Sequence, residues 1–172
     1  GKVEVQDLPM PLTGSDEVLV KIEYCALCAT DVHLVNNGLF DVVPPLIVGH
    51  EISGTVVEIG QDVVASNTFE IGDRVTACPA KHCGTCSYCQ KGLPMHCKDA
   101  AFDPSKKPMD AMAEYRTYKP QQLYKLPDNV PFEHACLVEP VTTACRGLQL
   151  ANMPLGSTVC VSGAGSIGLI ML

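Results

Sequence analysis

The stretch VGHEISGTVVEIG, residues 48–60, joins a strand pattern to two polar residues that a plain strand does not need. Residues 54–60 (GTVVEIG) alternate apolar and polar positions, as a strand with one buried face does, and glycine bounds them at each end. His50 and Glu51 stand at the head of this strand. A lone histidine in such a place is more often a hydrogen-bonded core residue than a metal ligand. The rest of the chain has to show what this pair does.

Four other segments alternate in the manner of strands: 18–24 (VLVKIEY), 73–78 (DRVTAC), 113–119 (AEYRTYK) and 122–126 (QLYKL). Pro120 separates the last two, and proline and glycine recur along this part of the chain. The pattern predicts a β-rich first domain, barrel-like or sandwich-like, rather than an array of repeats.

The pattern changes after Asn129. Residues 129–153 carry apolar side chains at helical spacing, and Pro131 stands near the expected helix start. Because Pro140 lacks a backbone donor, it predicts either a kink or the start of a second helix.

A glycine-rich turn stands near the end of the sequence. Residues 158–161 (TVCV) predict a buried strand, and an apolar helix is expected over residues 167–172. The turn between them contains Gly163, Gly165 and Gly168. This strand–turn–helix order is typical of a dinucleotide-binding fold, so we expect a domain boundary near residue 150.

Composition narrows the class of protein. Of the 172 residues, 47% are hydrophobic and 18% charged, which allows a sizeable core. A net charge of −7 argues against nucleic acid and anionic membranes as partners. No apolar run approaches the ~18 residues of a membrane span. The start, GKVEVQDLPMPL, lacks a signal-peptide shape and an initiator methionine. We expect a cytoplasmic protein that has been trimmed at this end.

Four of the ten cysteines form a regular group: Cys83, Cys86, Cys89 and Cys97. A disulfide-stapled scaffold needs a small core or an export signal, and neither is visible. A thioredoxin-like redox site needs a single C-x-x-C that opens a helix after a strand. Two-residue gaps let neighbouring thiolates converge on one ion, and structural zinc takes four of them in a tetrahedron. The spacing favours zinc, and a four-cysteine iron–sulfur cluster is the alternative.

Six motifs follow one another in a characteristic order. They are C-A-T-D-x-H (28–33), G-H-E-x-x-G-x-x-x-x-x-G (49–60), I-G-D-R-V (71–75), the four cysteines, L-V-E-P (137–140) and V-S-G-A-G-S-I-G (161–168). With these motifs the chain resembles the zinc-dependent medium-chain alcohol and polyol dehydrogenases over essentially its whole length. The resemblance implies a mainly β fold with some α: a GroES-like β-barrel catalytic domain over residues 1–150. The truncated start of a Rossmann α/β domain would follow over residues 151–172.

The resemblance also implies two zinc ions per chain. The four clustered cysteines would hold a structural ion. Cys28 and His50 would hold a catalytic ion, with a third ligand from Glu51 or Glu139, and the choice between these two stays open. Five further cysteines have no role in this scheme and are expected to be small buried hydrophobes: Cys25, Cys78, Cys136, Cys145 and Cys160.

The implied reaction interconverts an alcohol and a ketone or aldehyde, with hydride transfer to or from NAD or NADP. Thr30 would receive the proton of the substrate hydroxyl, His33 would pass it to solvent, and Asp31 would orient the zinc-binding histidine. The three glycines of the turn would bind the dinucleotide, and the residue that separates NAD from NADP would come about 20 positions later.

The substrate expected from the resemblance is a small alcohol, with polyols, vicinal diols or amino alcohols favoured by the Glu139-Pro140 pair. The full-length protein is expected to be a homo-oligomer, and residues 1–172 alone to be inactive. The alternative from another class is a non-enzymatic zinc-binding module that acts through protein contacts.

Overall fold

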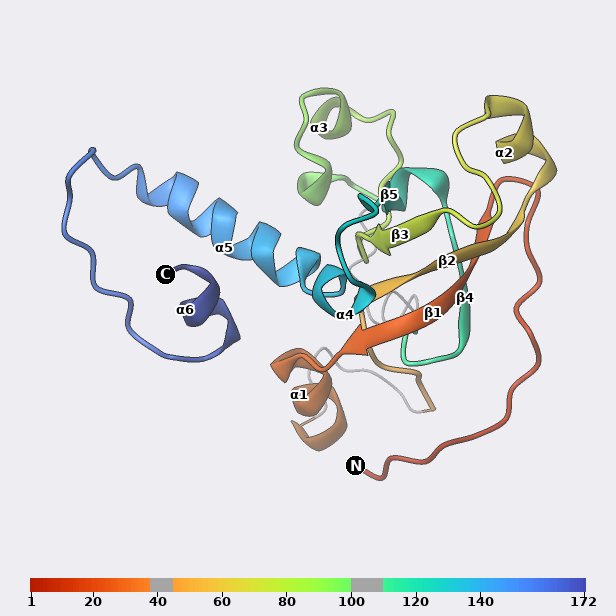
Figure 1. The fold of residues 1–172 in the computed structure, drawn as a ribbon, viewed down its shortest axis with the longest axis horizontal. Coiled ribbons are helices and arrows are strands. Elements are labelled where there is room, and N and C mark those ends of the chain that lie inside the picture. Colours follow the sequence, from red (N-terminus) through yellow and green to blue (C-terminus); the bar gives the residue numbers. More distant parts are fainter. Residues whose placement is uncertain (38–44, 100–109) are drawn as a thin grey trace.

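A computed structural model describes residues 1–37, 45–99 and 110–172, and a five-stranded antiparallel sheet dominates it (Figure 1). The strands are β1 (Val18–Ala26), β2 (Glu51–Ile59), β3 (Arg74–Ala77), β4 (Tyr115–Tyr118) and β5 (Leu123–Lys125), in the order β4-β1-β2-β3-β5. All five coincide with predicted strands. The difference that matters is at β2, which begins at Glu51 and so includes one of the two polar residues at its head.

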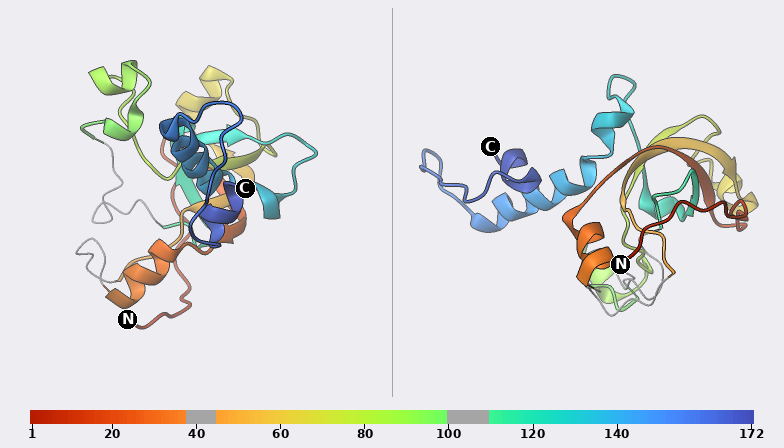
Figure 2. Two further views of the ribbon diagram at one scale, coloured as in Figure 1. Left: turned by 90° about the vertical axis from the view of Figure 1, so that its left-hand side faces the viewer. Right: turned by 90° about the horizontal axis from the view of Figure 1, so that it is seen from below.

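The sheet curls until its two edges approach each other. The edge strands β4 and β5 are joined by residues 119–122 alone, which form the short 3₁₀ turn η4 (Pro120–Gln122). So short a connection between the two edges requires a strongly curved sheet, and Figure 2 (right) shows β1 and β2 as parts of a curved wall. Gln122 is fully buried at this closure and donates its amide to the carbonyl of Cys78 at 3.2 Å. The predicted barrel-like body is confirmed.

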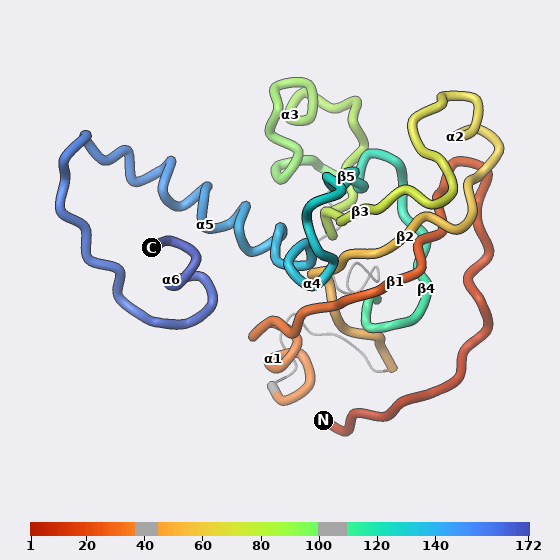
Figure 3. The backbone as a smooth tube through the Cα atoms, viewed as in Figure 1, coloured from red at the N-terminus to blue at the C-terminus, as the bar shows by residue number. Residues whose placement is uncertain are grey.

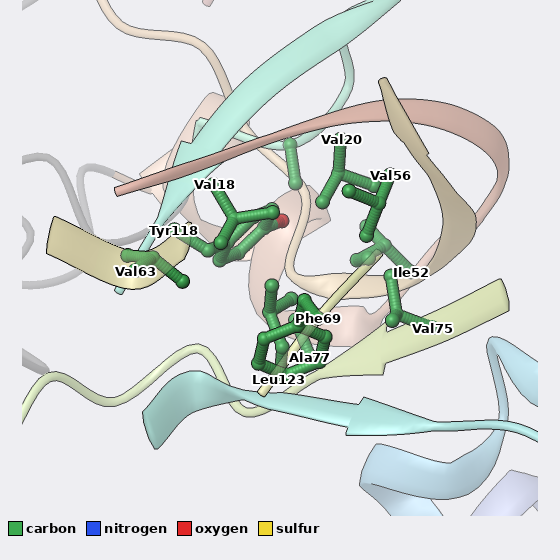
Figure 4. Close-up of a cluster of buried hydrophobic side chains, with 11 residues drawn as sticks. Val18, Val20, Ile52, Val56, Val63, Phe69, Val75, Ala77, Tyr118 and Leu123 are labelled. Carbon is green, nitrogen blue, oxygen red and sulfur yellow. The ribbon is translucent and has the colours of Figure 1, made fainter. Parts of the chain in front are cut away.

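The inside of the curl is filled by the apolar positions of the alternating strands (Figure 4). Val18 and Val20 of β1, Ile52 and Val56 of β2 and Val75 of β3 are completely buried. Each apolar side chain removed from water stabilises the fold by about 1.5–3 kcal/mol. This core holds β1 and β2 against each other.

Helices lie around the sheet and after it. They are α1 (Ala29–Asn37), α2 (Gln61–Ser66), α3 (Ser87–Gln90), α4 (Phe132–Ala135), α5 (Val138–Ala151) and α6 (Ser166–Ile170), with a further 3₁₀ turn η2 (Pro94–His96). None of those that the structure describes is long and apolar enough to cross a bilayer. The first three were not predicted, because each is short and lacks an apolar stripe. Pro140 lies in the first turn of α5, where its missing N–H costs nothing, so it marks the start of a second helix.

The last part of the chain differs from the prediction. Residues 158–161 form no strand, and Thr158, Val159 and Cys160 are exposed. A parallel strand is stabilised by hydrogen bonds to neighbouring strands and by burial of both faces, and the described residues place no strand beside this one. The predicted helix is present as α6, which lies beside α5 in Figure 1. At the other end of the chain, residues 1–17 pass around the outside of the sheet before β1 begins (Figure 3).

Candidate metal centres

Strand pairing brings Cys28 to His50 and Glu51. The antiparallel register of β1 and β2 sets Ala26 opposite Glu51, so the chain that leaves β1 passes directly beside the residue that precedes β2. Cys28, His50 and Glu51 each offer one ligand atom, and these atoms all lie within 4.8 Å of one another. Residues that are more than 20 positions apart in the sequence therefore form one compact donor group.

Asp31 links the two sides of this group. It is buried, and its carboxylate accepts hydrogen bonds from the backbone N–H of Cys28 and of Gly49, both at 2.9 Å. Its Oδ1 also lies 3.5 Å from Nδ1 of His50, while Nε2 of His50 lies 4.0 Å from Glu51. The ring is thus turned so that Nδ1 faces Asp31 and Nε2 faces the donor group. That is the orientation in which a carboxylate partner sets the tautomer of a metal-binding histidine.

Gly49 allows this close packing. Its φ is +94°, and a Cβ atom there would lie 2.6 Å from the Met112 side chain and 2.9 Å from Sγ of Cys25. Two backbone hydrogen bonds hold the approaching segment there: the N–H of Met112 donates to the carbonyl of Val48 at 2.7 Å, and the N–H of Ala111 donates to the carbonyl of Gly49 at 3.2 Å. Only glycine fits both the backbone conformation and the space.

Thr30 and His33 lie on α1, beside the donor group. Oγ1 of Thr30 is 3.5 Å from Sγ of Cys28, and the Thr30 side chain is half-buried. His33 is exposed. Residues three apart share one face of a helix, so the two side chains run from the site towards solvent. Their proposed roles as proton acceptor and relay stay predictions.

Glu139 is near the group but does not belong to it as closely. It lies in the first turn of α5, and it is absent from the described set of mutually close ligand atoms. Burial raises the pKa of Glu139, the charge of His50 opposes this shift, and the charge of Glu51 adds to it. Glu139 therefore lies close enough to His50 and Glu51 to feel their charges. Of the two glutamates that could supply the third ligand, Glu51 is the nearer to Cys28 and His50.

The electrostatics of the group suit a cation. Burial raises the pKa of the Cys28 thiol, and although its bond to Thr30 opposes this, the charge of Glu51 adds to it. Burial lowers the pKa of His50, but Asp31 outweighs that effect and the pKa is raised overall. A divalent cation would reverse this balance, because it stabilises the thiolate and the neutral imidazole. One thiolate, one imidazole and a carboxylate, with a position to spare, are a donor set that fits catalytic zinc.

The second group consists of the four clustered cysteines, whose sulfur atoms lie within 4.8 Å of one another. The Sγ–Sγ distances are 3.5 Å for Cys97–Cys83, 3.6 Å for Cys86–Cys89 and 4.0 Å for Cys83–Cys89. A tetrahedron with Zn–S bonds of about 2.3 Å has edges of about 3.8 Å, whereas a disulfide would require about 2.05 Å. An iron–sulfur cluster spreads its cysteines over several irons, which sets the sulfurs farther apart. The spacing therefore fits a single tetrahedral ion.

The pKa values of the four clustered cysteines, which we call the cysteine lobe, are shifted in opposite directions. Hydrogen bonds from Thr85 and from the amide of Cys86 lower the pKa of Cys83 to about 6. Loss of hydration and the neighbouring thiols raise the pKa of Cys89 to about 12. A metal ion bound here would displace the remaining protons. His82 and His96, which flank the cysteines, contribute no atom to either donor group within the described residues.

Residues 14–128 match the family described as alcohol dehydrogenase GroES-like domain. The chain belongs to this family. The match spans the curled sheet and both donor groups, so the expected GroES-like fold is confirmed and the resemblance inferred from the six motifs is correct.

Individual relatives of this GroES-like chain agree with one another. Sorbitol dehydrogenase of Bacillus subtilis is 30% identical over 98% of the chain and 48% of its own length. The structure of galactitol-1-phosphate dehydrogenase from Escherichia coli superposes with a TM-score of 0.89 at 31% identity, covering 99% of this chain and 48% of that one. A candidate zinc-binding dehydrogenase from Sinorhizobium meliloti 1021, bound to NADP, gives 0.85 at 33% identity, with coverages of 99% and 48%. The chain spans about half the length of the curated relatives it matches.

The glycine turn follows the part of the chain that matches the GroES-like family. Gly163 has φ +116°, and a Cβ atom on Gly168 would lie 1.9 Å from the carbonyl oxygen of Gly163. Gly165 immediately precedes α6. The three glycines thus form one tight turn at the start of that helix, and their role in dinucleotide binding stays a prediction.

The remaining cysteines of the GroES-like chain fall into two sets. Cys136 is buried and Cys25 and Cys78 are half-buried, and burial raises the pKa of Cys25 to about 11. Cys145 and Cys160 are exposed, so the expectation of burial is wrong for these two. Cys145 faces outward on α5, and Cys160 lies in the segment that forms no strand.

Proposed function

We propose that this chain carries the catalytic metal site of a zinc-dependent dehydrogenase that interconverts a polyol and the matching ketone with NAD or NADP. The observation that carries the proposal is the group of Cys28, His50 and Glu51, whose ligand atoms lie within 4.8 Å of one another. The ring of His50 is turned towards the group by Asp31. Zinc bound there would lower the pKa of a substrate hydroxyl towards neutrality.

The chain's own residues then have distinct tasks. Asp31 keeps Nδ1 of His50 engaged, so that Nε2 is available as a ligand. Oγ1 of Thr30, beside Cys28, accepts the hydroxyl proton of the substrate, and His33 on the same face of α1 releases it to solvent. Glu139 borders the site from α5 and adds negative charge close to His50. The nicotinamide ring of the dinucleotide would exchange hydride with the carbon that bears the hydroxyl.

The second ion is assigned to the four cysteines, as a closed structural site. Four thiolates leave no position for water or substrate, whereas three protein ligands leave one. We therefore propose two zinc ions per chain, one in each of the described donor groups.

Polyols are the favoured substrate class. The relatives named above act, by their names, on sorbitol and on galactitol 1-phosphate. This chain shares with the polyol-type pattern a glutamate before Pro140. Residues 1–150 would form the catalytic domain, and residues 151–172 would begin the dinucleotide-binding domain. A cytoplasmic homo-oligomer is part of the same proposal. The comparisons name dehydrogenases and give no support to a non-enzymatic zinc module.

Metal content tests the assignment directly. Elemental analysis of zinc-replete, full-length protein should give two zinc ions per chain. Because one site is open and the other closed, a mild chelator should remove one ion first and abolish polyol oxidation with it. One zinc per chain, or the absorbance of an iron–sulfur cluster, would contradict the two-site assignment.

Thr30→Val separates the enzyme from a binding module. The change removes the hydroxyl but keeps the shape, so polyol oxidation should fall about 100-fold or more while both zinc ions remain bound. Thr68→Val is the control. Thr68 is exposed, and its hydroxyl forms a hydrogen bond with that of Ser66, the last residue of α2. Equal rates in Thr30→Val and the wild type would exclude the proton path.

A further inference from the structure

The guanidinium of Arg74 binds several carbonyl oxygens of one short segment. Arg74 is the first residue of β3, and its Nη1 donates to the carbonyls of Pro127 at 3.1 Å and Asp128 at 2.9 Å. Its Nη2 donates to the carbonyl of Val130. The guanidinium carbon also lies 4.5 Å from the centre of the Phe132 ring. A planar fork of N–H groups makes this arrangement possible, and a lysine ammonium could not reproduce it.

The segment needs such a clamp because it cannot pair with the sheet. The N–H of Leu126 makes the last backbone bond to β3, at 2.8 Å to the carbonyl of Arg74. Pro127 and Pro131 then lack an N–H group, so the ladder cannot continue past them. Beyond Leu126 the side chain of Arg74 supplies the hydrogen bonds to β3 that the backbone no longer makes, and these bonds fix the connection from β5 to α4.

A second tether ends at the same point. Ser53, completely buried in β2, donates its hydroxyl to the carbonyl of Phe132 at 2.6 Å. Phe132 is the first residue of α4. The start of α4 is therefore held to β3 by Arg74 and to β2 by Ser53, and Ser53 lies only two residues beyond Glu51.

What these tethers hold is the helix that carries Glu139. α4 ends at Ala135 and α5 begins at Val138, so a turn of only two residues separates the helices, and Glu139 lies in the first turn of α5. Figure 1 shows α4 against the sheet and α5 leaving from it. A displacement at Phe132 would be passed to Glu139, because the turn between the helices is itself fixed: the N–H of Leu137 donates to the carbonyl of His134 in α4, and the N–H of Val141 in α5 donates to the carbonyl of Leu137.

We propose that Arg74 is a positioning residue, which sets the place of Glu139 beside the Cys28/His50/Glu51 group by holding the start of α4. This inference rests on the proposed function. Arg74 acts through residues 127–132 and not by contact with substrate.

The test uses the full-length enzyme with cobalt(II) exchanged into the labile site and zinc kept in the cysteine lobe. The absorption of the cobalt–thiolate pair reports the site independently of turnover. Arg74→Ala should shift this absorption and lower kcat/KM about 10- to 100-fold, as a small misplacement of a site group does. Guanidinium ion at millimolar concentration should restore part of the loss. Arg74→Lys should recover little, and Ser53→Ala should shift the absorption in the same direction.

Lys125→Gln is the matched control. Lys125 belongs to β5, pairs with the neighbour of Arg74 in β3, and also holds its cation over an aromatic ring, that of Phe69 at 5.6 Å. Its removal should change neither the absorption nor kcat/KM. In a Glu139→Gln background, Arg74→Ala should cost about twofold or less, since the group that Arg74 positions is already lost.

An unchanged cobalt absorption in a folded Arg74→Ala protein, or equal losses with and without Glu139, would overturn the role of Arg74. If Arg74→Ala does not fold, unchanged absorption in both Arg74→Lys and Ser53→Ala overturns it. A wild-type enzyme without cobalt absorption or without polyol oxidation would contradict the proposed function instead.

Discussion

Glu139 shows what a single ligand-type residue does to stability when no cation is bound. Burial raises its pKa above the ordinary value of 4.5, against the opposing charge of His50 and with a contribution from Glu51. A carboxyl group whose pKa is raised on folding disfavours the folded state once it ionises. The loss of stability therefore begins above pH 4.5 and is complete above the pKa of the folded state.

We expect Glu139→Gln to raise the urea midpoint of the metal-free protein at about pH 7 and to leave it unchanged at about pH 4. Equilibrium unfolding at the two pH values measures this. Glu133→Gln is the control, because Glu133 is an exposed carboxylate in the preceding helix α4. The same gain at both pH values would mean that the effect of Glu139→Gln is not one of charge.

At the scale of an element, the glycines of the turn before α6 differ in whether the structure has room for a side chain. A Cβ atom on Gly168 would lie 1.9 Å from the Gly163 carbonyl, whereas one on Gly165 meets nothing within 4 Å. Gly165 also has φ −80°, which alanine adopts freely. Gly168→Ala must therefore distort the turn, while Gly165→Ala fits it.

Calorimetric titration with NAD and NADP, together with the melting temperature of the full-length enzyme, distinguishes Gly168→Ala from Gly165→Ala. Gly168→Ala should weaken NAD or NADP binding and lower the melting temperature together. Gly165→Ala should weaken dinucleotide binding about tenfold or more without a change in melting temperature, because its methyl group occupies the space where the pyrophosphate approaches the backbone. Full affinity in Gly165→Ala would show that the turn does not bind the dinucleotide.

On the scale of the whole molecule, the curled sheet is both the core and the frame of the metal site. Ile52 is completely buried and stands between Glu51 and Ser53 on β2. Ile52→Ala should lower the free energy of unfolding by about 2–5 kcal/mol. Ile71→Ala, at a side chain that is 72% exposed, should change it by about 0.5 kcal/mol or less. Urea unfolding of both variants tests whether the stability of the chain resides inside the curl.

Much of this architecture is encoded locally and could be predicted. Strand alternation depends only on neighbouring residues, so all five strands were found from their period of two. The spacing of the four cysteines is similarly local, and one loop with Gly84 and Gly92 suffices to bring their sulfurs together. The start of α1 also has a local signal: Asp31 stands three residues after Cys28 and accepts its N–H, which is one of the two bonds of a capping box.

Other features depend on contacts between distant parts of the chain. The motifs of the sequence indicated that Cys28, His50 and Glu51 belong together, but the register of β1 against β2 is what sets Ala26 opposite Glu51 and closes the site. The same pairing gives Asp31 its bond to Gly49, and only the folded sheet brings Arg74 to the carbonyls of residues 127–130. Residues 158–161 are the converse case, since they have the composition of a buried strand and form none. A strand pattern records which side chains prefer burial, whereas a strand exists only where neighbouring backbones supply its hydrogen bonds, and that is decided by tertiary structure.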